Sequence, residues 1–298
     1  MGTAVRTIAA VALTAALAFS SACSKPAEQP AAEPKIAPPL IAEAGVLRAG
    51  VDLTYPPFAG TDKDIEAGID IDIAEAIAAQ LGLTLEMVQV KPGEATSALD
   101  AGTVDIVLSV PLDPEAVMGA RIAGTYLADG PAFFTQSAEE TAAADAGTGE
   151  APASTEATDT AKMLTPSAFA GQRIAAQRGS PAFWMLEYDL GEGVAVPFET
   201  LRAAFEALAA DEVDVVVGQA SVGTYIARDF DGASLAGQYG PGTALGVAVK
   251  LGNDELGDVV RDTLDGLASG GALKAIRATW LGDQPLVALP EGDGADDF

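Results

Sequence analysis

The sequence predicts an α/β fold built on parallel-rich sheets, with enough apolar residues for two domains. Short apolar strands alternate with helical segments from about residue 46 to residue 281, and such alternation is typical of parallel sheets. The chain has 298 residues, of which 49% are hydrophobic. A chain of this size and composition can bury two ordinary cores.

The first half of the pattern is clear. Strands are predicted at residues 46–51, 83–90 and 104–109, and helices at residues 72–81 and 94–101, which Gly82 and Gly102 end. Ligands of parallel sheets bind at loops beyond the carboxyl ends of the strands. We therefore expect residues 52–58 and 109–111 to lie at a cleft.

The second half repeats the alternation after an interruption. A helix is expected to start after residues 178–181 and to run through Trp184. The other predicted helices cover residues 200–210, 221–229, 253–268 and 272–280. Strands are predicted at residues 172–177, 193–196, 213–217 and 243–250.

Charge and residue usage exclude several classes of function. The 43 acidic residues against 16 basic ones give a net charge of -27, which repels nucleic acid and anionic membrane surfaces. The sequence contains no histidine, so histidine metal sites and Ser-His-Asp triads are excluded. We expect no metal and no cofactor.

The N-terminus is typical of an exported chain. Arg6 precedes an apolar run at residues 8–19, and the small residues 20–22 come directly before Cys23, the only cysteine. This pattern predicts a signal peptide at residues 1–22 and lipidation of Cys23. Cleavage after Ala22 that leaves a free thiol is the alternative. We expect residues 23–45, rich in proline and alanine, to be a disordered tether. The mature protein would be anchored at the periplasmic or cell surface.

One internal segment breaks the α/β pattern. Residues 136–162 are small, acidic and free of aromatic side chains, so they bury too little apolar surface to become ordered. We interpret them as a disordered acidic insertion. A docking arm and a tolerated insertion are both consistent with this composition, and the second is favoured.

Residues 46–111 carry a specific resemblance. The strand at residues 46–51, the Tyr-Pro-Pro-Phe turn at residues 55–58, and the Asp70-x-Asp72 helix start resemble the first lobe of the periplasmic solute-binding proteins of family 3. Those proteins serve ABC transporters of polar amino acids. The resemblance continues to about residue 281, apart from the insertion.

The resemblance implies a two-lobed periplasmic-binding-protein-like fold of type II, with a central cleft and two crossover strands. Residues 46–133 and 243–281 would form lobe one, and residues 134–242 lobe two. Residues 282–298 would be a flexible tail. The resemblance also implies a monomer that captures a small polar solute and delivers it to an ABC permease in the membrane.

The resemblance also implies where the ligand binds. In the family, an aromatic side chain of the first turn covers the ligand, and either Tyr55 or Phe58 matches it; one of the two could instead be core. Ser109 matches a small residue that offers polar contacts, although it could be a plain turn residue. The turn at Gly179 and Ser180 presents backbone N–H groups at a helix start. The candidate ligand-binding residues are Asp52, Tyr55, Phe58, Ser109, Arg121, Gly179, Ser180 and Gln219.

Two positions depart from the family pattern. Ala116 stands where the family has an arginine that grips the ligand α-carboxylate. Arg121 is a substitute from the neighbouring turn, or a plain surface residue. Gln219 stands where the family has an aspartate for the ligand ammonium, and an amide carries no charge. We therefore expect standard α-amino acids to bind weakly.

Three functions follow from these observations. The first is a solute receptor that closes over its ligand by hinge motion. The second is an accessory or sensory lipoprotein without transport. The third is a dehydratase or transglycosylase that shares the fold, and it is disfavoured because the cleft segments show no paired carboxylates for acid–base chemistry. We therefore predict that the chain is not an enzyme.

Overall fold

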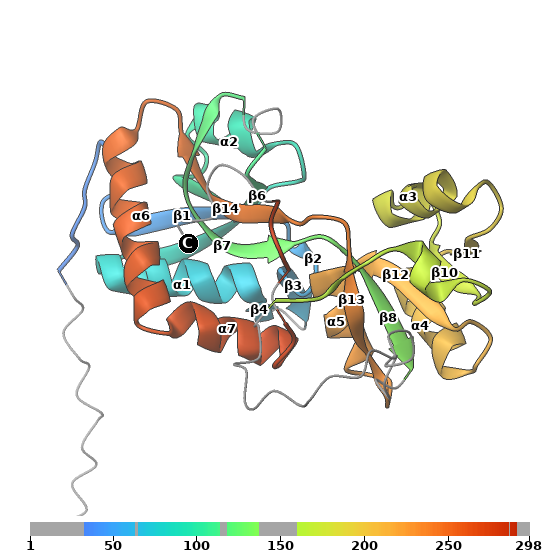
Figure 1. Ribbon diagram of the computed structural model, residues 1–298. Helices are drawn as coiled ribbons and strands as arrows, with labels where there is room; N and C mark the ends of the chain where they lie inside the picture. Colours follow the sequence, from blue (N-terminus) through green and yellow to red (C-terminus); the bar gives the residue numbers. More distant parts are fainter. Residues whose placement is uncertain (1–32, 63–64, 114–117, 137–159, 286, 291–298) are drawn as a thin grey trace, which may run out of the picture. The chain divides into compact units, whose positions relative to one another are not determined.

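The computed structural model describes residues 33–62, 65–113, 118–136, 160–285 and 287–290. These residues form two lobes, each built on one mixed sheet (Figure 1). Lobe one contains the five-stranded sheet and lobe two the six-stranded sheet, as the resemblance predicts. Within the described residues, no helix is both long and apolar enough to cross a membrane.

The sheet of lobe one has the strand order β5-β1-β6-β14-β7. β1 pairs in parallel with β5 and with β6, whereas β14 pairs antiparallel with both β6 and β7. Its strands are β1 (Val46–Val51), β5 (Thr84–Gln89), β6 (Ile106–Pro111), β7 (Ala120–Asp129) and β14 (Thr243–Lys250).

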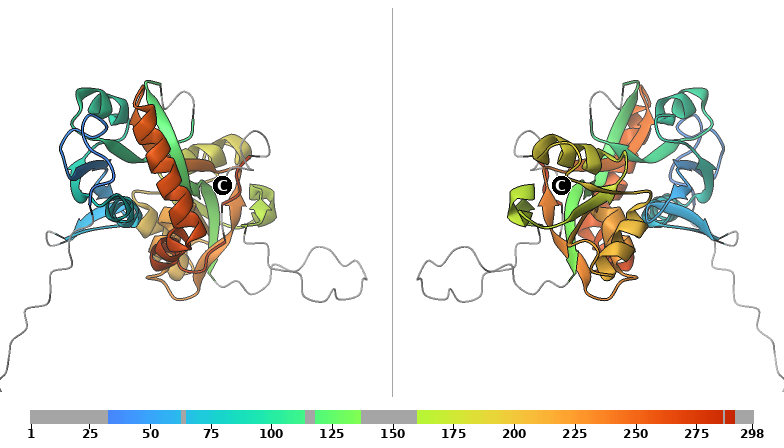
Figure 2. Two further views of the ribbon diagram at one scale, coloured as in Figure 1. Left: turned by 90° about the vertical axis from the view of Figure 1, so that its left-hand side faces the viewer. Right: turned by 90° about the vertical axis from the view of Figure 1, so that its right-hand side faces the viewer.

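Helices cover both faces of this sheet (Figure 2). One face packs on α1 (Ile69–Leu81), α6 (Asp254–Ser269) and α7 (Ala272–Leu281). The other face packs on α2 (Ala95–Ala101) through Leu99. A small sheet of β2 (Thr54–Tyr55), β3 (Ala59–Asp62) and β4 (Ile65–Ala67) precedes α1. Gly68 is required there, because a Cβ would lie 2.2 Å from the carbonyl oxygen of Phe58.

The sheet of lobe two has the strand order β11-β10-β12-β8-β13-β9. Successive side chains of β12 point to opposite faces of this sheet, so lobe two has a core on each face. Val216 packs with Phe205 on one face, while Val215 and Val217 pack with Phe133 on the other. Its strands are β8 (Pro131–Gln136), β9 (Met163–Leu164), β10 (Ile174–Gln177), β11 (Val196–Phe198), β12 (Val215–Gln219) and β13 (Ala233–Tyr239).

The helices of lobe two also lie on both faces of its sheet. One face carries α3 (Pro181–Leu190) and the 3-10 helix η1 (Pro166–Phe169), and the other carries α4 (Leu201–Ala209) and α5 (Ala220–Ala227). The side chain of Ser180 begins α3 by accepting a hydrogen bond from Phe183 N at 3.1 Å. Thr200 caps α4 in the same way through Ala203 N.

The chain crosses between the sheets twice, as predicted. The first crossing lies at Gly130, between β7 and β8, and the second lies between Tyr239 and Thr243. The predicted boundary at residue 133 is three residues late, because β8 begins at Pro131 and its Phe133 is fully buried in lobe two. The strands β7 and β8 belong to different sheets and only Gly130 separates them, so the sequence has no turn signal from which to place the crossing.

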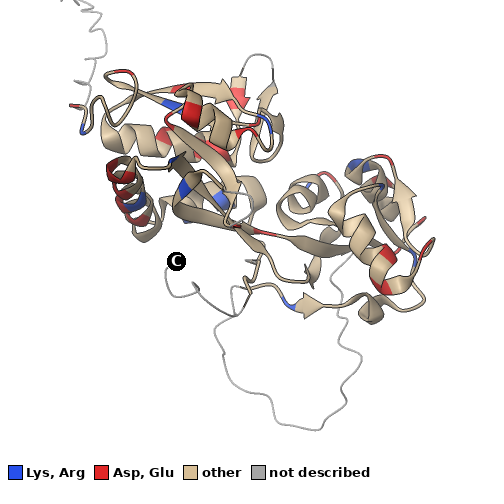
Figure 3. Cartoon of the chain, turned by 90° about the horizontal axis from the view of Figure 1, so that it is seen from above, with Lys and Arg blue, Asp and Glu red and all other residues tan. Residues whose placement is uncertain are grey.

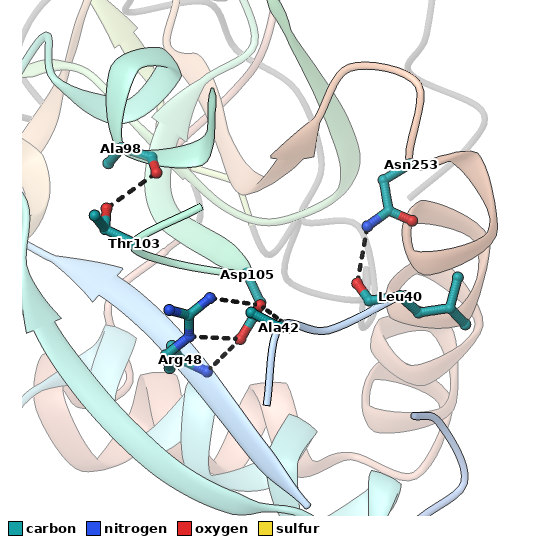
Figure 4. A network of polar contacts seen from close by, with 7 residues as sticks. All are labelled: Leu40, Ala42, Arg48, Ala98, Thr103, Asp105 and Asn253. Atoms are coloured by element: carbon teal, nitrogen blue, oxygen red, sulfur yellow. Dashed lines mark hydrogen bonds and ion pairs between the residues drawn. The ribbon is translucent and has the colours of Figure 1, made fainter. Parts of the chain in front are cut away.

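The segment before β1 differs from the predicted tether. Ile36 and Ile41 are buried in the core of lobe one. Ala42 N donates to Asp105, which also forms an ion pair with Arg48 (Figure 4). The proline- and alanine-rich composition concealed the two isoleucines that attach residues 33–45 to the lobe. The rest of the predicted tether, with Cys23 and the signal peptide, lies outside the described residues.

The segment after α7 also differs from the predicted flexible tail. Val287 packs against the core of lobe two. Ala288 exchanges two backbone hydrogen bonds with the buried side chain of Gln238, at 2.7 and 2.8 Å. Gly242 N donates to the same Ala288 carbonyl at 2.9 Å. The chain therefore contacts lobe two again after its last helix.

The strands β7, β8 and β13 are absent from the sequence prediction. Residues of β7 and β13 are mostly half-buried on both faces and give no period-two alternation. Arg121 consequently lies within strand β7, and the interpretation that it sits in a turn is wrong. Residues 137–159 of the predicted acidic insertion lie outside the described residues.

Candidate ligand-binding cavity

A cavity of about 700 Å³ is lined by residues of both lobes and of both crossings. Lobe one contributes the ends of β1 and β6 and the starts of α1 and α2. Lobe two contributes Pro181, Met185 and Gln219, while Gly130 and Pro241 come from the crossings. The volume is that of typical small-molecule sites.

Five of the eight predicted ligand-binding residues line this cavity. They are Asp52, Tyr55, Phe58, Ser109 and Gln219. The strand ends and the first turn therefore meet where the order of the parallel strands predicts.

The aromatic turn places its two rings differently. The rings of Tyr55 and Phe58 are stacked, with centroids 5.5 Å apart and an interplanar angle of 5°. Phe58 is 2% exposed and Tyr55 is 45% exposed. Tyr55 thus offers a face and a hydroxyl to the cavity, while Phe58 supports it from the core.

Asp52 is held by three donors on one oxygen. Thr54 N, Thr54 Oγ1 and Gln89 Nε2 all donate to its Oδ1, at 3.1, 2.6 and 3.0 Å. The bonds from Thr54 and Gln89 outweigh the effect of burial and lower the pKa of Asp52. Asp52 therefore remains a carboxylate at neutral pH.

Ser109 belongs to a buried relay that the sequence did not reveal in full. Its backbone N donates to Tyr126 Oη at 2.7 Å, and Tyr126 Oη donates to Asp70 Oδ1 at 2.6 Å. Ser109 has a positive φ of 54°, a conformation that a non-glycine residue adopts only when its surroundings hold it. Asp70 lines the cavity and is 1% exposed. Burial raises its pKa to about 7, against the bonds from Ser109 and Tyr126.

A second buried carboxylate lies at the first crossing. Asp129 ends β7, lines the cavity, and accepts a hydrogen bond from Ser221 N of α5 at 2.9 Å. Burial raises the pKa of Asp129 to about 6, against its backbone hydrogen bonds. The junction of two strands gives no pattern that would have identified this residue, whereas the Asp70-x-Asp72 helix start was visible but was not assigned to the site.

The other three predicted residues lie away from the cavity lining. Arg121 donates to Asp258 at 2.6 Å and to Asp254 at 3.3 Å, both on α6. This corrects the suggestion that Arg121 replaces the family arginine, because its guanidinium is committed to a helix of lobe one. Gly179 and Ser180 form the start of α3, where the Ser180 hydroxyl caps the helix, and the lining begins with Pro181.

The chemistry of the cavity suits binding. Acidic positions occur on both lobes (Figure 3), but no group of three or more potential metal ligands occurs among the described residues. Ala116, the other departure from the family pattern, lies outside them. The site combines an aromatic face, a serine, an amide and carboxylates in a space of solute size.

Comparisons with known proteins agree with this geometry. The model of the family described as bacterial extracellular solute-binding proteins, family 3, matches residues 47–283. The L-cystine-binding protein TcyJ of Escherichia coli is 22% identical over 247 residues, which cover 81% of this chain and 85% of the relative. A putative ABC transporter arginine-binding protein of the same organism is also 22% identical, with 80% and 91% covered.

Solved structures show the same fold. A polar amino acid ABC uptake transporter substrate-binding protein of Streptococcus thermophilus has a TM-score of 0.65 at 18% identity, covering 82% of this chain and 88% of its own. The unliganded, open L-cystine solute receptor of Neisseria gonorrhoeae has a TM-score of 0.63 at 18% identity, covering 83% and 96%.

Proposed function

The chain belongs to the bacterial extracellular solute-binding proteins of family 3, and we propose that it captures a small polar solute for an ABC transporter. This is a family of binding proteins, in keeping with the prediction that the chain is not an enzyme. The observation that carries the proposal is the cavity of about 700 Å³, to which both lobes and both crossings contribute. A ligand that touches both lobes stabilises their closure, because its contacts are complete only when the lobes meet around it.

The binding residues in this proposal are those that line the cavity and carry polar or aromatic groups. Tyr55 covers the carbon skeleton of the ligand, Ser109 and Gln219 offer it hydrogen bonds, and Asp52 offers it a negative charge. The printed names of the relatives suggest L-cystine and arginine as the first ligands to try. Gln219 in place of an aspartate, and Ala116 in place of an arginine, argue that standard α-amino acids bind weakly.

Membrane attachment is part of the proposal. The apolar run at residues 8–19 followed by small residues and Cys23 is typical of lipoprotein signals. Lipid on Cys23 would hold the protein at the outer face of a membrane, near the permease that it serves. A Cys23→Ser form should leave the membrane fraction, and a form that stays there would contradict anchoring through this residue.

The binding proposal is tested by thermal unfolding of the mature protein over a panel of amino acids, amines, organic acids and sugars. Each ligand that raises the melting temperature is then titrated by calorimetry against the native protein and against Tyr55→Ala and Gln219→Ala. We expect micromolar or tighter binding that both substitutions weaken at least tenfold. Binding that neither substitution changes would show that the solute site lies elsewhere.

A further inference from the structure

The cavity lining is strongly biased in charge. Among the described residues, four aspartates from four separate segments line it, and Lys91 is the one basic residue. Arginine is missing from this described part of the lining. The aspartates are Asp52 after β1, Asp70 in α1, Asp113 after β6 and Asp129 at the end of β7.

Two of these aspartates are buried without a cationic partner. Asp70 is 1% exposed and Asp129 is 6% exposed. Within the described part of the chain neither forms an ion pair, and their hydrogen bonds come from uncharged donors such as Tyr126 and Ser221 N. Burying carboxyl groups in this way is costly. A general surplus of surface acid does not explain it, since surface carboxylates remain in water.

The exposed aromatic of the site lies within the field of the same carboxylates. After burial, the negative charges of Asp129 and Asp52 are the causes that raise the pKa of Tyr55. Tyr55 therefore lies in the field of two carboxylates, one from the segment after β1 and one from the end of β7. A cation over an aromatic face gains from the ring as well as from neighbouring carboxylates.

Among the described lining residues, no arginine is available to pair with a ligand carboxylate. Arg121, the nearest candidate by sequence, is bound to Asp254 and Asp258 outside the cavity. Lys91 is exposed, and it would be the lone charged partner for a carboxylate placed among four aspartates. The aspartates would repel a ligand carboxylate, most strongly where water is excluded from the cavity.

From these observations we propose that the ligand is an organic cation without a free carboxylate, such as a protonated amine, a guanidinium or a quaternary ammonium compound. This inference rests on the proposed function and specifies its ligand. Asp129 and Asp52 would face the cationic group, Tyr55 would cover it, and Asp70 would supply negative charge from the floor of the cavity.

The test uses pairs of organic cations in which one member carries a carboxylate and the other does not. They are agmatine and arginine, cadaverine and lysine, and choline and glycine betaine. Each is titrated by calorimetry into the full mature protein. We expect the member without a carboxylate to bind at least tenfold more tightly in at least one pair, and no member with a carboxylate to bind more tightly than its partner.

Substitutions that remove one negative charge and keep the shape of the side chain extend the test. Asp129→Asn and Asp52→Asn should each weaken binding of the preferred cation about tenfold or more. Asp265→Asn removes the same charge from an exposed position of α6, and it should change the affinity less than twofold. The melting curve of each variant shows whether it folds. If one of the two site variants misfolds, the affinity of the other still tests the proposal.

Proton release supplies a further readout. A cation beside Asp129 and Asp70 should deprotonate both, so the affinity should rise from pH 5 to pH 8. In the part of the lining that the structure describes, the other groups that carry or change charge are Asp52, Asp113, Lys91 and Tyr55. Calorimetry in buffers of different ionisation enthalpy should show protons leaving the protein on binding, and uptake of protons would contradict the proposal.

The possible failures are distinguishable. Tighter binding of arginine, lysine or betaine than of their partners overturns the cation inference and leaves the receptor function standing. Binding of a neutral or anionic solute alone does the same. If no solute of any class binds, both the inference and the proposed function fail.

Discussion

The hydroxyl of Tyr126 donates to Oδ1 of Asp70 across 2.6 Å, from a strand at one end of lobe one to the first turn of α1. The hydroxyl oxygen of Tyr126 in turn accepts a hydrogen bond from Ser109 N at 2.7 Å. One phenol therefore joins three elements beneath the cavity and holds Ser109 at its positive φ. The position of the predicted binding residue Ser109 therefore depends on Tyr126, which the sequence did not single out, and on Asp70, which it indicated only as part of a helix start.

The first prediction concerns pH and Asp70. The pKa of Asp70 is raised from 3.8 to about 7 in the folded protein, so the folded state keeps a proton that the unfolded chain releases. The resulting stabilisation is complete below about pH 4 and is lost as the pH rises through 7. In Asp70→Asn this loss should disappear. The free energy of unfolding of the variant, relative to the native protein, should rise between pH 4 and pH 8 by about 1.4 kcal/mol per pKa unit.

Urea unfolding of both proteins at several pH values measures this difference. Asp265→Asn, which replaces an exposed carboxyl of α6, serves as the control for the loss of one carboxyl group. Parallel curves for Asp70→Asn and the native protein would show that Asp70 titrates normally.

The second prediction concerns the phenol itself. Tyr126→Phe leaves both Ser109 N and the Asp70 carboxyl without this partner, and an unsatisfied buried polar group costs about 1–3 kcal/mol. We expect a lower melting temperature and weaker ligand binding, because Ser109 lines the cavity. Tyr188→Phe removes a hydroxyl that is 90% exposed and should change neither quantity. Equal melting temperatures for Tyr126→Phe and the native protein would contradict this role of the relay.

Much of the fold could be predicted because its main strands are continuous apolar runs. The strand at Val215–Gln219 is preceded by Val213 and buries three successive valines, and helices such as α1 end at a glycine in the left-handed conformation. The unpredicted strands β7 and β13 mix small, polar and apolar residues along both faces. Their place is decided by pairing with β14 and β8 rather than by their own pattern.

The candidate site could be predicted in part for a similar reason. Asp52 and Ser109 follow or end apolar strands, so the topology alone brings them to one edge. Asp129 ends β7, one residue before β8 begins, and Tyr126 lies within the same strand, which was not predicted. Arg121 was predicted to lie in the turn near Ala116 and to reach the ligand from there. It lies instead in β7, and its side chain forms ion pairs with Asp254 and Asp258 of α6.

The third prediction tests that correction. Arg121→Ala removes ion pairs with Asp254 and Asp258, whose side chains are largely exposed, and such pairs contribute up to about 1 kcal/mol. We expect a small loss of stability that shrinks further at high salt, and a ligand affinity within twofold of the native value. Arg202→Ala, which breaks the exposed pair with Asp229 in lobe two, is the matched control. A tenfold loss of affinity in Arg121→Ala alone would restore Arg121 to the binding site.

The last prediction concerns the segment after α7. Gln238 is fully buried, and its amide exchanges hydrogen bonds with Ala288 N and O at 2.7 and 2.8 Å. Ending the chain after Pro285 removes these partners and the acceptor of Gly242 N. Because each orphaned buried group costs about 1–3 kcal/mol, the melting temperature should fall by roughly 2–4 °C for each kcal/mol lost in a chain of this size. Ending the chain after Pro290 keeps the segment and should leave the melting temperature unchanged. If both truncated forms melt together with the native protein, these bonds do not stabilise the second crossing.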